Sequence, residues 1–363
     1  MKEPTAAILN DPGPAASRPP GAHRLLEVKG LVKHFAVRKS LLLRSRGRVH
    51  AVDGLSFTLE ENETLGLVGE SGCGKSTAGF SILRIIEPTA GEVWFEGRDL
   101  LALDREQMRQ VRRRMQVVFQ DPYGSLNPRL TVARIVEEPL SNYEAVPPAQ
   151  RSERVIETLR LVGLRPEQAQ RFPHEFSGGQ RQRICIARAL ILGPKLIVCD
   201  EPVSALDVSV RAQVLNLMVR LQNQLSLSYL FISHDLSVVR YISHRVAVMY
   251  LGQIVELSPV RDLYAEPLHP YTRALLSAVP APDPRRRRQR IILEGDVPSP
   301  LNPPSGCRFH PRCPERKPVC LESEPEARRV NDKRLVKCHL YDGHPAWRPD
   351  HLPEENNPKG GEK

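Results

Sequence analysis

The segment that most constrains the fold is Gly69–Ser76, which reads Gly-Glu-Ser-Gly-Cys-Gly-Lys-Ser. It matches the pattern G-x-x-x-x-G-K-S/T, follows the apolar run Thr64–Val68 and opens a helical pattern from Lys75 to Arg84. Glycines let the backbone curl so that successive N–H groups point at a phosphate, and the helix adds its positive N-terminus. The sequence therefore predicts a strand, a phosphate-binding loop and a helix, in this order.

Two side chains of this loop carry specific chemistry. Lys75 can reach the β- and γ-phosphates of a nucleotide, and the Ser76 hydroxyl can ligate Mg²⁺. A glycine-rich turn that matches by chance is the alternative, but the flanking strand and helix favour the nucleotide interpretation. The residues expected around the phosphates are Gly69, Ser71, Gly72, Cys73, Gly74, Lys75, Ser76 and Thr77.

A second apolar strand, Leu196–Cys199, ends in two acids, Asp200 and Glu201. Carboxylates at such a position are costly to bury unless they are paired or bound to a metal ion. Beside a phosphate loop, Asp200 would hold Mg²⁺, and Glu201 would orient and deprotonate the attacking water. The alternative is a pair of acids at a strand end that faces solvent.

The segment Ser177-Gly178-Gly179-Gln180 precedes an apolar helical run from Ile184 to Leu190. Serine is a good helix N-cap, and the two glycines would let a ligand approach the backbone. This predicts a second helix N-terminus that receives an anion, which suggests a dimer, because one nucleotide needs one phosphate loop. A plain loop-to-helix cap is the alternative.

Two single polar residues end other apolar runs. Gln120 follows Val117–Phe119, where its amide could contact Mg²⁺ or the attacking water. His234 follows Leu230–Ile232, where its imidazole could donate to the γ-phosphate. Taken singly, each is more commonly an ordinary surface residue.

The order of the patterns predicts an α/β fold with a substantially parallel sheet, because apolar strands alternate with helices. A mostly helical block between Asp104 and Gly193 would be a subdomain inserted between strands. We expect a disordered tail over residues 1–23, an ATPase domain over 24–266, an appendage over 267–341 that is rich in proline, arginine and cysteine, and a flexible tail over 342–363.

The bulk properties are those of a soluble globular protein. No apolar run approaches the ~20 residues of a membrane-spanning helix, and the proline-rich N-terminus has no apolar segment for export, so we expect a cytosolic location. The formal net charge of +10 predicts an anionic partner, such as nucleotide, nucleic acid or an acidic membrane surface. The basic runs Arg112–Arg114 and Arg285–Arg288 are equally explained as solvated faces and linkers.

Taken together and in order, these segments resemble the ABC ATPase family over about residues 25 to 260. The resemblance implies ATP and Mg²⁺ as ligands, and two cassettes that pair head to tail, so that each ATP lies between the phosphate loop of one and the Ser177–Gln180 signature of the other. Phe35 matches the position of the aromatic residue that stacks on adenine. Ser204-Ala205-Leu206-Asp207 matches the D-loop, with Asp207 near the nucleotide.

Two longer stretches, Phe119–Pro128 and Leu268–Leu276, resemble the oligopeptide/dipeptide/nickel importer subfamily. This implies an ATPase that works at the cytoplasmic face of the cell membrane with two transmembrane permeases and an extracytoplasmic binding protein. The basic stretch before Ala51 and the Tyr123-Gly124-Ser125 segment are similar to the F-type subunit, which favours a heterodimer with a second ATPase. Dipeptides, longer peptides, nickel or another solute all remain possible substrates.

Four of the seven cysteines, Cys307, Cys313, Cys320 and Cys338, fall together with the spacing C-x5-C-x6-C-x17-C. An odd cysteine number without an export signal argues against a disulfide framework and suits a metal centre. The spacing lacks the C-x2-C pairs of zinc ribbons. The importer resemblance implies a 4Fe–4S cluster, while zinc or free thiols are the alternatives, and His310 and His339 are possible substitute ligands.

Two other classes of function are less well supported. ABC ATPases of translation carry two cassettes in one chain, and those of DNA maintenance carry long coiled coils, whereas this chain has one cassette and no heptad run. We therefore expect no nucleic-acid partner. A regulator without turnover would be expected to lack Glu201 or the signature, and both are present.

Overall fold

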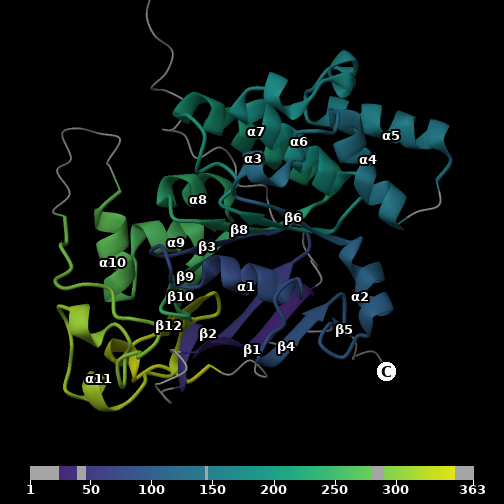
Figure 1. Ribbon diagram of the computed structural model, residues 1–363. Helices are drawn as coiled ribbons and strands as arrows, with labels where there is room; N and C mark the ends of the chain where they lie inside the picture. Colours follow the sequence, from purple (N-terminus) through teal and green to yellow (C-terminus); the bar gives the residue numbers. More distant parts are fainter. Residues whose placement is uncertain (1–23, 39–45, 144–145, 280–289, 348–363) are drawn as a thin grey trace, which may run out of the picture.

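The computed structural model describes residues 24–38, 46–143, 146–279 and 290–347. Within these ranges the chain forms two sheets, with one helix between them and most of the others on the far side of the larger sheet (Figure 1). The predicted tail 1–23, the basic run Arg285–Arg288 and most of the predicted tail 342–363 lie outside the described residues.

The larger sheet has the strand order β11-β12-β10-β9-β3-β8-β7-β6. Strands β9, β3, β8, β7 and β6 are parallel, and β10, β12 and β11 are added antiparallel at one end. The predicted parallel α/β sheet is therefore confirmed. Its strands are β3 (Thr64–Val68), β6 (Met115–Val118), β7 (Leu196–Asp200), β8 (Ser228–Ser233), β9 (Arg245–Tyr250), β10 (Gln253–Pro259), β11 (Ala327–Asn331) and β12 (Arg334–Lys337).

The central strands are continuous apolar runs because both of their faces are buried. In β8, Tyr229 and Phe231 belong to the core on the side of the helical block. Leu230 and Ile232 belong to the core on the other side, toward the smaller sheet. The alternation of side chains along a strand thus supplies two cores from one short segment.

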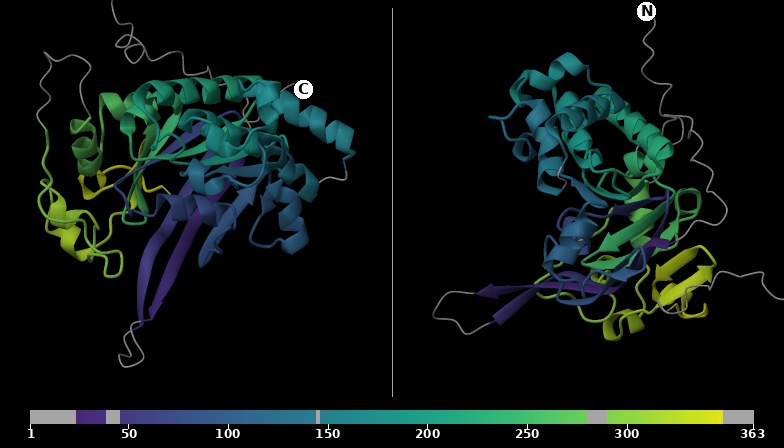
Figure 2. Two further views of the ribbon diagram at one scale, coloured as in Figure 1. Left: turned by 45° about the horizontal axis from the view of Figure 1, so that its top comes forward. Right: turned by 90° about the vertical axis from the view of Figure 1, so that its right-hand side faces the viewer.

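The smaller sheet is antiparallel, with the order β2-β1-β4-β5. Its strands are β1 (Arg24–Arg38), β2 (Arg46–Glu60), β4 (Ala90–Phe95) and β5 (Arg98–Asp99). Helix α1 (Lys75–Ile82) contacts β1 and β2 on one side and β7 and β8 on the other, so it lies between the sheets. Figure 2 shows the paired far ends of β1 and β2 extending beyond the rest of the chain.

The other helices cover the edges and the outer face of the larger sheet (Figure 1). They are α2 (Arg105–Arg112), α3 (Pro122–Ser125), α4 (Val132–Tyr143), α5 (Pro148–Leu161), α6 (Gly178–Leu190), α7 (Val208–Leu225), α8 (Leu236–Ile242), α9 (Val260–Ala265), α10 (Pro270–Ser277) and α11 (Val319–Glu322). In the described part of the chain, none is both long and apolar enough to cross a membrane.

The helical block differs from its predicted extent at the N-terminal side. The prediction placed its start at Asp104, but α2 is followed by β6, whose four residues pair with β7 in the larger sheet. The contiguous helical block therefore begins at Pro122, in α3, and runs to Leu190. The apolar residues of β6 account for the difference, because they complete the sheet beside Leu196–Cys199.

The C-terminal segment is not detached from the nucleotide-binding core. Strand β12 pairs with β10 through Glu256–Val336 and Leu257–Leu335, so the residues predicted to form an appendage extend the larger sheet. The reason is that β12 buries Val336 beside Leu268 and Cys338 while its backbone pairs with β10. The cysteine-bearing residues are thereby fixed against the ATPase core.

Candidate active site

The sheet topology brings the predicted motifs to one edge. Strands β3, β8, β7 and β6 are parallel neighbours, and the phosphate loop, His234, Asp200–Glu201 and Gln120 come at or just beyond their carboxyl ends. In open α/β sheets, ligands bind outside the carboxyl ends of the strands. Residues that are far apart in sequence therefore meet at this edge.

The phosphate loop needs glycine at two positions because other backbone lies very close. A Cβ atom on Gly74, where φ is +104°, would lie 1.9 Å from the Ala51 carbonyl oxygen. A Cβ atom on Gly69 would lie 2.2 Å from the Met249 carbonyl oxygen. Alanine at either position would force the backbone to move, so these glycines permit the curled loop before α1.

Lys75 is folded back over its own loop. Its ammonium group donates to the Gly69 carbonyl at 2.8 Å and to the Glu70 carbonyl at 2.9 Å, and the residue is only 5% exposed. Both contacts are to backbone oxygens, so the positive charge has no carboxylate partner among these bonds. The loop thus holds a buried cation where the motif expects the terminal phosphates.

Ser76 and Asp200 form the candidate Mg²⁺ position. The Ser76 hydroxyl donates to Asp200 Oδ1 at 2.7 Å. Burial raises the pKa of Asp200, and the hydrogen bond from Ser76 opposes that shift. A buried carboxylate next to a hydroxyl fits a hard cation, because the cation would stabilise the charge that burial penalises.

Glu201 is held at both carboxylate oxygens. Its Oε1 lies 2.9 Å from His234 Nδ1, and its Oε2 accepts from Gln120 Nε2 at 3.1 Å. The Glu201 side chain is 15% exposed, while that of His234 is 56% exposed, so the acid lies inside and the imidazole at the rim. Glu201 also has a positive φ of 46°, an uncommon conformation for a non-glycine residue that occurs at functional sites.

The structure therefore gathers five of the predicted site residues into one constellation: Ser76, Gln120, Asp200, Glu201 and His234. Ser204, which was not predicted as a site residue, supports it by donating its hydroxyl to the Glu201 carbonyl at 3.0 Å. Its place in the matched D-loop segment was the available sequence signal.

The signature segment lies elsewhere in this chain. Ser177 caps α6 in a reciprocal pair with Gln180: the Gln180 N–H donates to Ser177 Oγ at 3.4 Å, and the Ser177 N–H to Gln180 Oε1 at 3.0 Å. Helix α6 packs with the core on the outer face of the sheet, whereas α1 packs on the inner face. Gly179 is packed closely, since an added Cβ would lie 2.2 Å from Val210.

Phe35 and Asp207, two further predicted nucleotide contacts, lie at exposed positions, and Thr77 is partly buried. Phe35 pairs with Val49 across the β1–β2 hairpin and is 39% exposed, with the Lys33 ammonium 4.9 Å from its ring centroid. Asp207 precedes α7, where its carbonyl accepts from the Arg211 N–H at 2.8 Å. Thr77 lies in the first turn of α1. Their roles toward a nucleotide remain predictions.

Sequence reasoning missed a second set of contacts to the phosphate loop. Glu70 lies in an unspecified position of the motif, but its carboxylate pairs with Arg312, from the C-terminal segment, at 2.9 Å and 3.2 Å. The Glu70 N–H donates to the Tyr271 hydroxyl at 3.0 Å. No local pattern signals either contact, because the partners are about two hundred residues away in sequence.

The four C-terminal cysteines are gathered in the fold. Burial, together with the neighbouring Cys307, Cys313 and Cys320, raises the pKa of the Cys338 thiol to about 12. Burial likewise raises the pKa of Cys313 to about 11, and Cys307 and Cys320 are among its neighbours. Thiols that hinder one another's ionisation in this way suit a cationic centre, which would stabilise all of them as thiolates.

The two histidines of this region already have other partners. His310 Nδ1 lies 2.9 Å from the Cys307 carbonyl. His339 lies between the Asp342 carboxylate, at 2.9 Å, and the Ser323 carbonyl, at 3.0 Å. Both ring nitrogens of His339 are therefore engaged, whereas these contacts engage only Nδ1 of His310, whose role as a substitute ligand stays a prediction.

Two family models match the chain. The model for the ABC transporter family matches residues 52–204. The model for the oligopeptide/dipeptide transporter C-terminal region matches residues 255–320, a range that includes Tyr271, Arg312 and three of the four cysteines. The first match covers the phosphate loop, the signature and the Asp200–Glu201 strand.

Curated relatives match over nearly their whole length. The oligopeptide transport ATP-binding protein AppF of Bacillus subtilis (strain 168) is 55% identical over 320 residues, which are 87% of this chain and 97% of AppF. The probable peptide ABC transporter ATP-binding protein y4tS of Sinorhizobium fredii (strain NBRC 101917 / NGR234) is 54% identical over 87% of this chain and 90% of y4tS.

Solved structures match the ATPase core. A dimeric ATP-binding cassette in a post-hydrolysis state with ADP and Pi is 28% identical, with a TM-score of 0.58 over 65% of this chain and 99% of that one. The cassette cbiO1 from Clostridium perfringens is 26% identical, with a TM-score of 0.58 over 67% of this chain and 91% of its own. The chain therefore belongs to the ATP-hydrolysing subunits of ABC transporters, within the group that carries the oligopeptide/dipeptide transporter C-terminal region.

Proposed function

We propose that this chain is the ATPase subunit that powers import of peptides through an ABC transporter. The observation that carries the proposal is the Glu201 carboxylate, held between Gln120 and His234 beside the Ser76–Asp200 pair. The substrate class is supported by the names of the relatives AppF and y4tS, which describe oligopeptide and peptide transport. Nickel or another small solute is the alternative cargo for the same motor.

Each residue of the constellation has a defined part in hydrolysis. Lys75 and the loop N–H groups bind the terminal phosphates, while Ser76 and Asp200 would hold Mg²⁺, which would neutralise phosphate charge. Glu201 accepts a proton from the attacking water. Gln120 and His234 keep the Glu201 carboxylate oriented, and the exposed His234 imidazole is placed to donate to the γ-phosphate.

A second cassette completes the site. Ser177 and α6 belong to a different core from the phosphate-loop helix α1 of their own chain, which supports a head-to-tail pair in which each signature serves the partner's ATP. The F-type resemblance favours a different ATPase as the partner. Two permeases would hold the pair at the cytoplasmic face of the cell membrane, and an extracytoplasmic protein would deliver the substrate.

Affinity purification from the native membranes tests this assembly. The tagged full-length chain is extracted in mild detergent, and the proteins that accompany it are identified by mass spectrometry. We expect two polytopic permeases and a second ATPase at near-equal amounts. Recovery of this chain as the only ATPase, together with permeases, would show that the ATPase pair is a homodimer and not a heterodimer. Ribosomal or DNA-repair proteins without any permease would contradict the transport function.

We further propose that Cys307, Cys313, Cys320 and Cys338 hold a 4Fe–4S cluster with a structural role. A single tetrahedral zinc with bonds of about 2.3 Å would hold its sulfurs about 3.8 Å apart. Among the described residues, no three of these thiols form a group whose sulfurs all lie within 4.8 Å of one another. A cubane spaces four thiolates more widely than one ion does, so the lack of a closer group among the described residues is compatible with a cluster.

Replacement of Cys320 by serine tests the cluster. In anaerobically purified protein, we expect Cys320→Ser to lose most of the bound iron and the visible-range absorbance, because the cluster would lose one of its four thiolates. Cys185→Ser is the matched control, since Cys185 is also buried but contacts Ser125 in the helical block. Wild-type protein that carries zinc, or no metal, would contradict the proposal.

A further inference from the structure

The C-terminal segment contacts the phosphate loop through Arg312. The two terminal nitrogens of Arg312 donate to the two carboxylate oxygens of Glu70, at 2.9 Å and 3.2 Å. This is the bidentate geometry that makes arginine–carboxylate pairs directional as well as strong. The Arg312 side chain is only 9% exposed, so solvent screens the pair less than a surface ion pair.

Glu70 is fixed at three points, and each has a different partner. Arg312 binds its carboxylate, the Tyr271 hydroxyl accepts its N–H at 3.0 Å, and its carbonyl accepts from the Lys75 ammonium at 2.9 Å. Tyr271 in turn packs edge-on against Tyr250, with 4.7 Å between ring centroids. The position of the Glu70 carbonyl, and with it that of Lys75, therefore depends on partners outside the loop.

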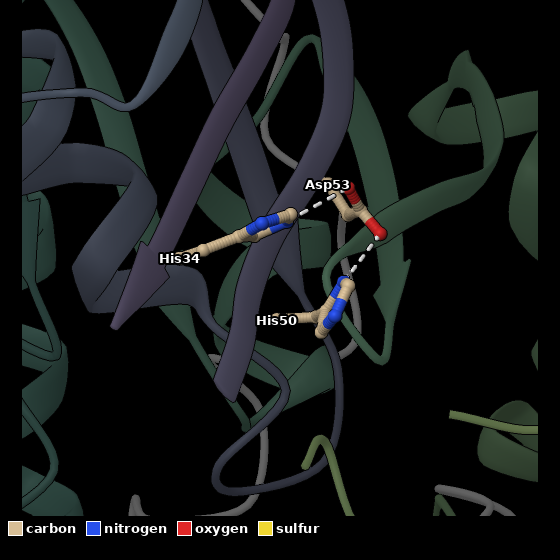
Figure 3. A group of neighbouring side chains, drawn as sticks. All are labelled: His34, His50 and Asp53. Atoms are coloured by element: carbon tan, nitrogen blue, oxygen red, sulfur yellow. Dashed lines mark hydrogen bonds and ion pairs between the residues drawn. The ribbon is translucent and has the colours of Figure 1, made fainter. Parts of the chain in front are cut away.

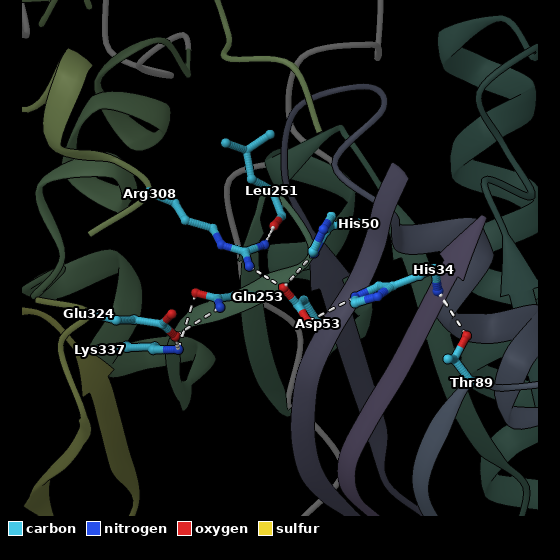
Figure 4. Close-up of polar contacts among 9 residues, drawn as sticks. All are labelled: His34, His50, Asp53, Thr89, Leu251, Gln253, Arg308, Glu324 and Lys337. Atoms are coloured by element: carbon cyan, nitrogen blue, oxygen red, sulfur yellow. Dashed lines mark hydrogen bonds and ion pairs between the residues drawn. The ribbon is translucent and has the colours of Figure 1, made fainter. Parts of the chain in front are cut away.

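A second arginine of the C-terminal segment, Arg308, contacts residues that neighbour the phosphate loop. Arg308 pairs with Asp53 of β2 and donates to the Leu251 carbonyl (Figure 4). The next residue, Gly252, donates its N–H to the Cys73 carbonyl in the phosphate loop at 2.9 Å. Arg308 is thus linked to the phosphate loop through the peptide group that joins Leu251 and Gly252.

Asp53 is the centre of this second attachment. His34 of β1 and His50 of β2 contact its two oxygens at 3.0 Å and 3.2 Å (Figure 3). Burial raises the pKa of Asp53, but Arg308 and the two histidines lower it more, to about 2. His34, His50 and Asp53 lie close enough together to hold a metal ion. Because Arg308 already balances the negative charge of Asp53, we interpret the group as an ionic network.

Both arginines are adjacent in sequence to cysteines of the C-terminal group. Arg308 follows Cys307, and Arg312 precedes Cys313, with one short 3-10 turn over His310–Arg312 between them. The Cys307 N–H also donates to the Cys320 carbonyl at 2.9 Å. A change that moves the cysteines would therefore displace the backbone from which these guanidinium groups reach the loop.

We propose that Arg312 is a positioning residue for nucleotide binding, which holds the phosphate loop in its ATP-accepting geometry through Glu70. Because Arg312 is fixed by the cysteine segment, the state of the four cysteines sets the affinity for ATP. The first statement rests on the contacts of Arg312 alone, whereas the second also rests on the proposed cluster.

The test is equilibrium binding of a non-hydrolysable ATP analogue to the full-length chain, together with steady-state ATPase kinetics. Arg312→Gln should weaken analogue binding and raise KM about tenfold, since hydrogen bonds to charged groups are lost, while kcat changes by less than about threefold. The analogue affinity of Arg312→Lys should lie between those of the wild type and Arg312→Gln, because lysine keeps the charge without the bidentate geometry. Equal affinity in wild type and Arg312→Gln would overturn the proposal.

The matched control is Arg273→Gln. Arg273 pairs with Glu315 of the same segment at 2.7 Å and makes no bond to Glu70, so its removal should leave analogue affinity unchanged. An equal loss in Arg273→Gln would assign the effect to general destabilisation and overturn the proposal. In a double-mutant cycle, Glu70→Gln combined with Arg312→Gln should be no worse than either change alone. Additive losses would also contradict it.

The coupling between the four cysteines and ATP affinity is tested separately, by measuring iron content beside analogue affinity. Cys313→Ser should lower iron content and analogue affinity together, and in an Arg312→Gln background its effect on affinity should be smaller, since only the Arg308 attachment remains. Iron loss with unchanged affinity would overturn the coupling between cysteines and loop while leaving the role of Arg312 intact. Wild-type protein that binds the analogue but holds no iron would overturn the cluster and its coupling instead.

Discussion

Replacement of Glu201 by glutamine should reduce ATP turnover by about 10²-fold or more, while ATP binding persists. The amide is nearly isosteric, so contacts with Gln120 and His234 remain possible, but it cannot accept a proton from water. The change leaves unaltered Lys75 and Ser76, which are proposed to contact the phosphates and Mg²⁺. Steady-state hydrolysis and equilibrium nucleotide binding, measured on the same preparation, separate the two effects.

The matched control for this change is Glu63→Gln, since Glu63 is also a shielded carboxylate but pairs with Arg245 at the amino end of β3. Any effect of Glu63→Gln should appear as reduced stability and not as a selective loss of kcat. Normal hydrolysis by Glu201→Gln would show that another group accepts the proton, and the assignment of Glu201 as the general base would be wrong.

Replacement of Lys75 by alanine should weaken ATP binding about a hundredfold, because the phosphates lose a buried, charge-assisted donor. Turnover should fall with it, since the same charge stabilises the transferring phosphoryl group. Loop folding should survive, because among the described residues the Lys75 ammonium donates only to the Gly69 and Glu70 carbonyls and, more weakly, to the Cys73 sulfur. Analogue titration and thermal unfolding measure the two properties separately.

A lysine at the opposite edge of the sheet provides the comparison for Lys75. Lys195 immediately precedes β7, so it lies at the amino end of the strand that carries Asp200 at its other end. Lys195→Ala removes the same charge without touching the site, and nucleotide affinity should stay within a factor of about two. Unchanged binding in Lys75→Ala would mean that the loop N–H groups alone carry the affinity.

Much of the active site could be predicted from sequence because its motifs are local. The phosphate loop, with its strand and helix, occupies one continuous stretch, and Asp200–Glu201 end an apolar strand. Gln120 and His234 were weak signals by themselves. Their site role is supported by the strand order β8-β7-β6, because the ends of β8 and β6 then lie on the two sides of Glu201. Only the order of the motifs along the chain suggested this arrangement.

Other features could not be predicted because they depend on pairing at long range. Glu70 and Arg312 are 242 residues apart, and neither stands in a pattern that signals an ion pair. Strand β11 has the sequence Ala-Arg-Arg-Val-Asn, which lacks apolar alternation and becomes a strand by pairing with β12. The strand β6 was likewise absorbed into the predicted helical block, because four residues are too few to show a period.

The pairing of β12 with β10 also limits where this chain can be cut. Glu256, in β10, is fully buried and accepts from the N–H groups of Leu268 and His269 at 2.9 Å, with Arg334 of β12 3.7 Å away. A truncation after residue 266 would uncover this carboxylate and leave β10 as an open sheet edge. Such edges recruit other chains, so a minimal cassette made in this way would tend to aggregate.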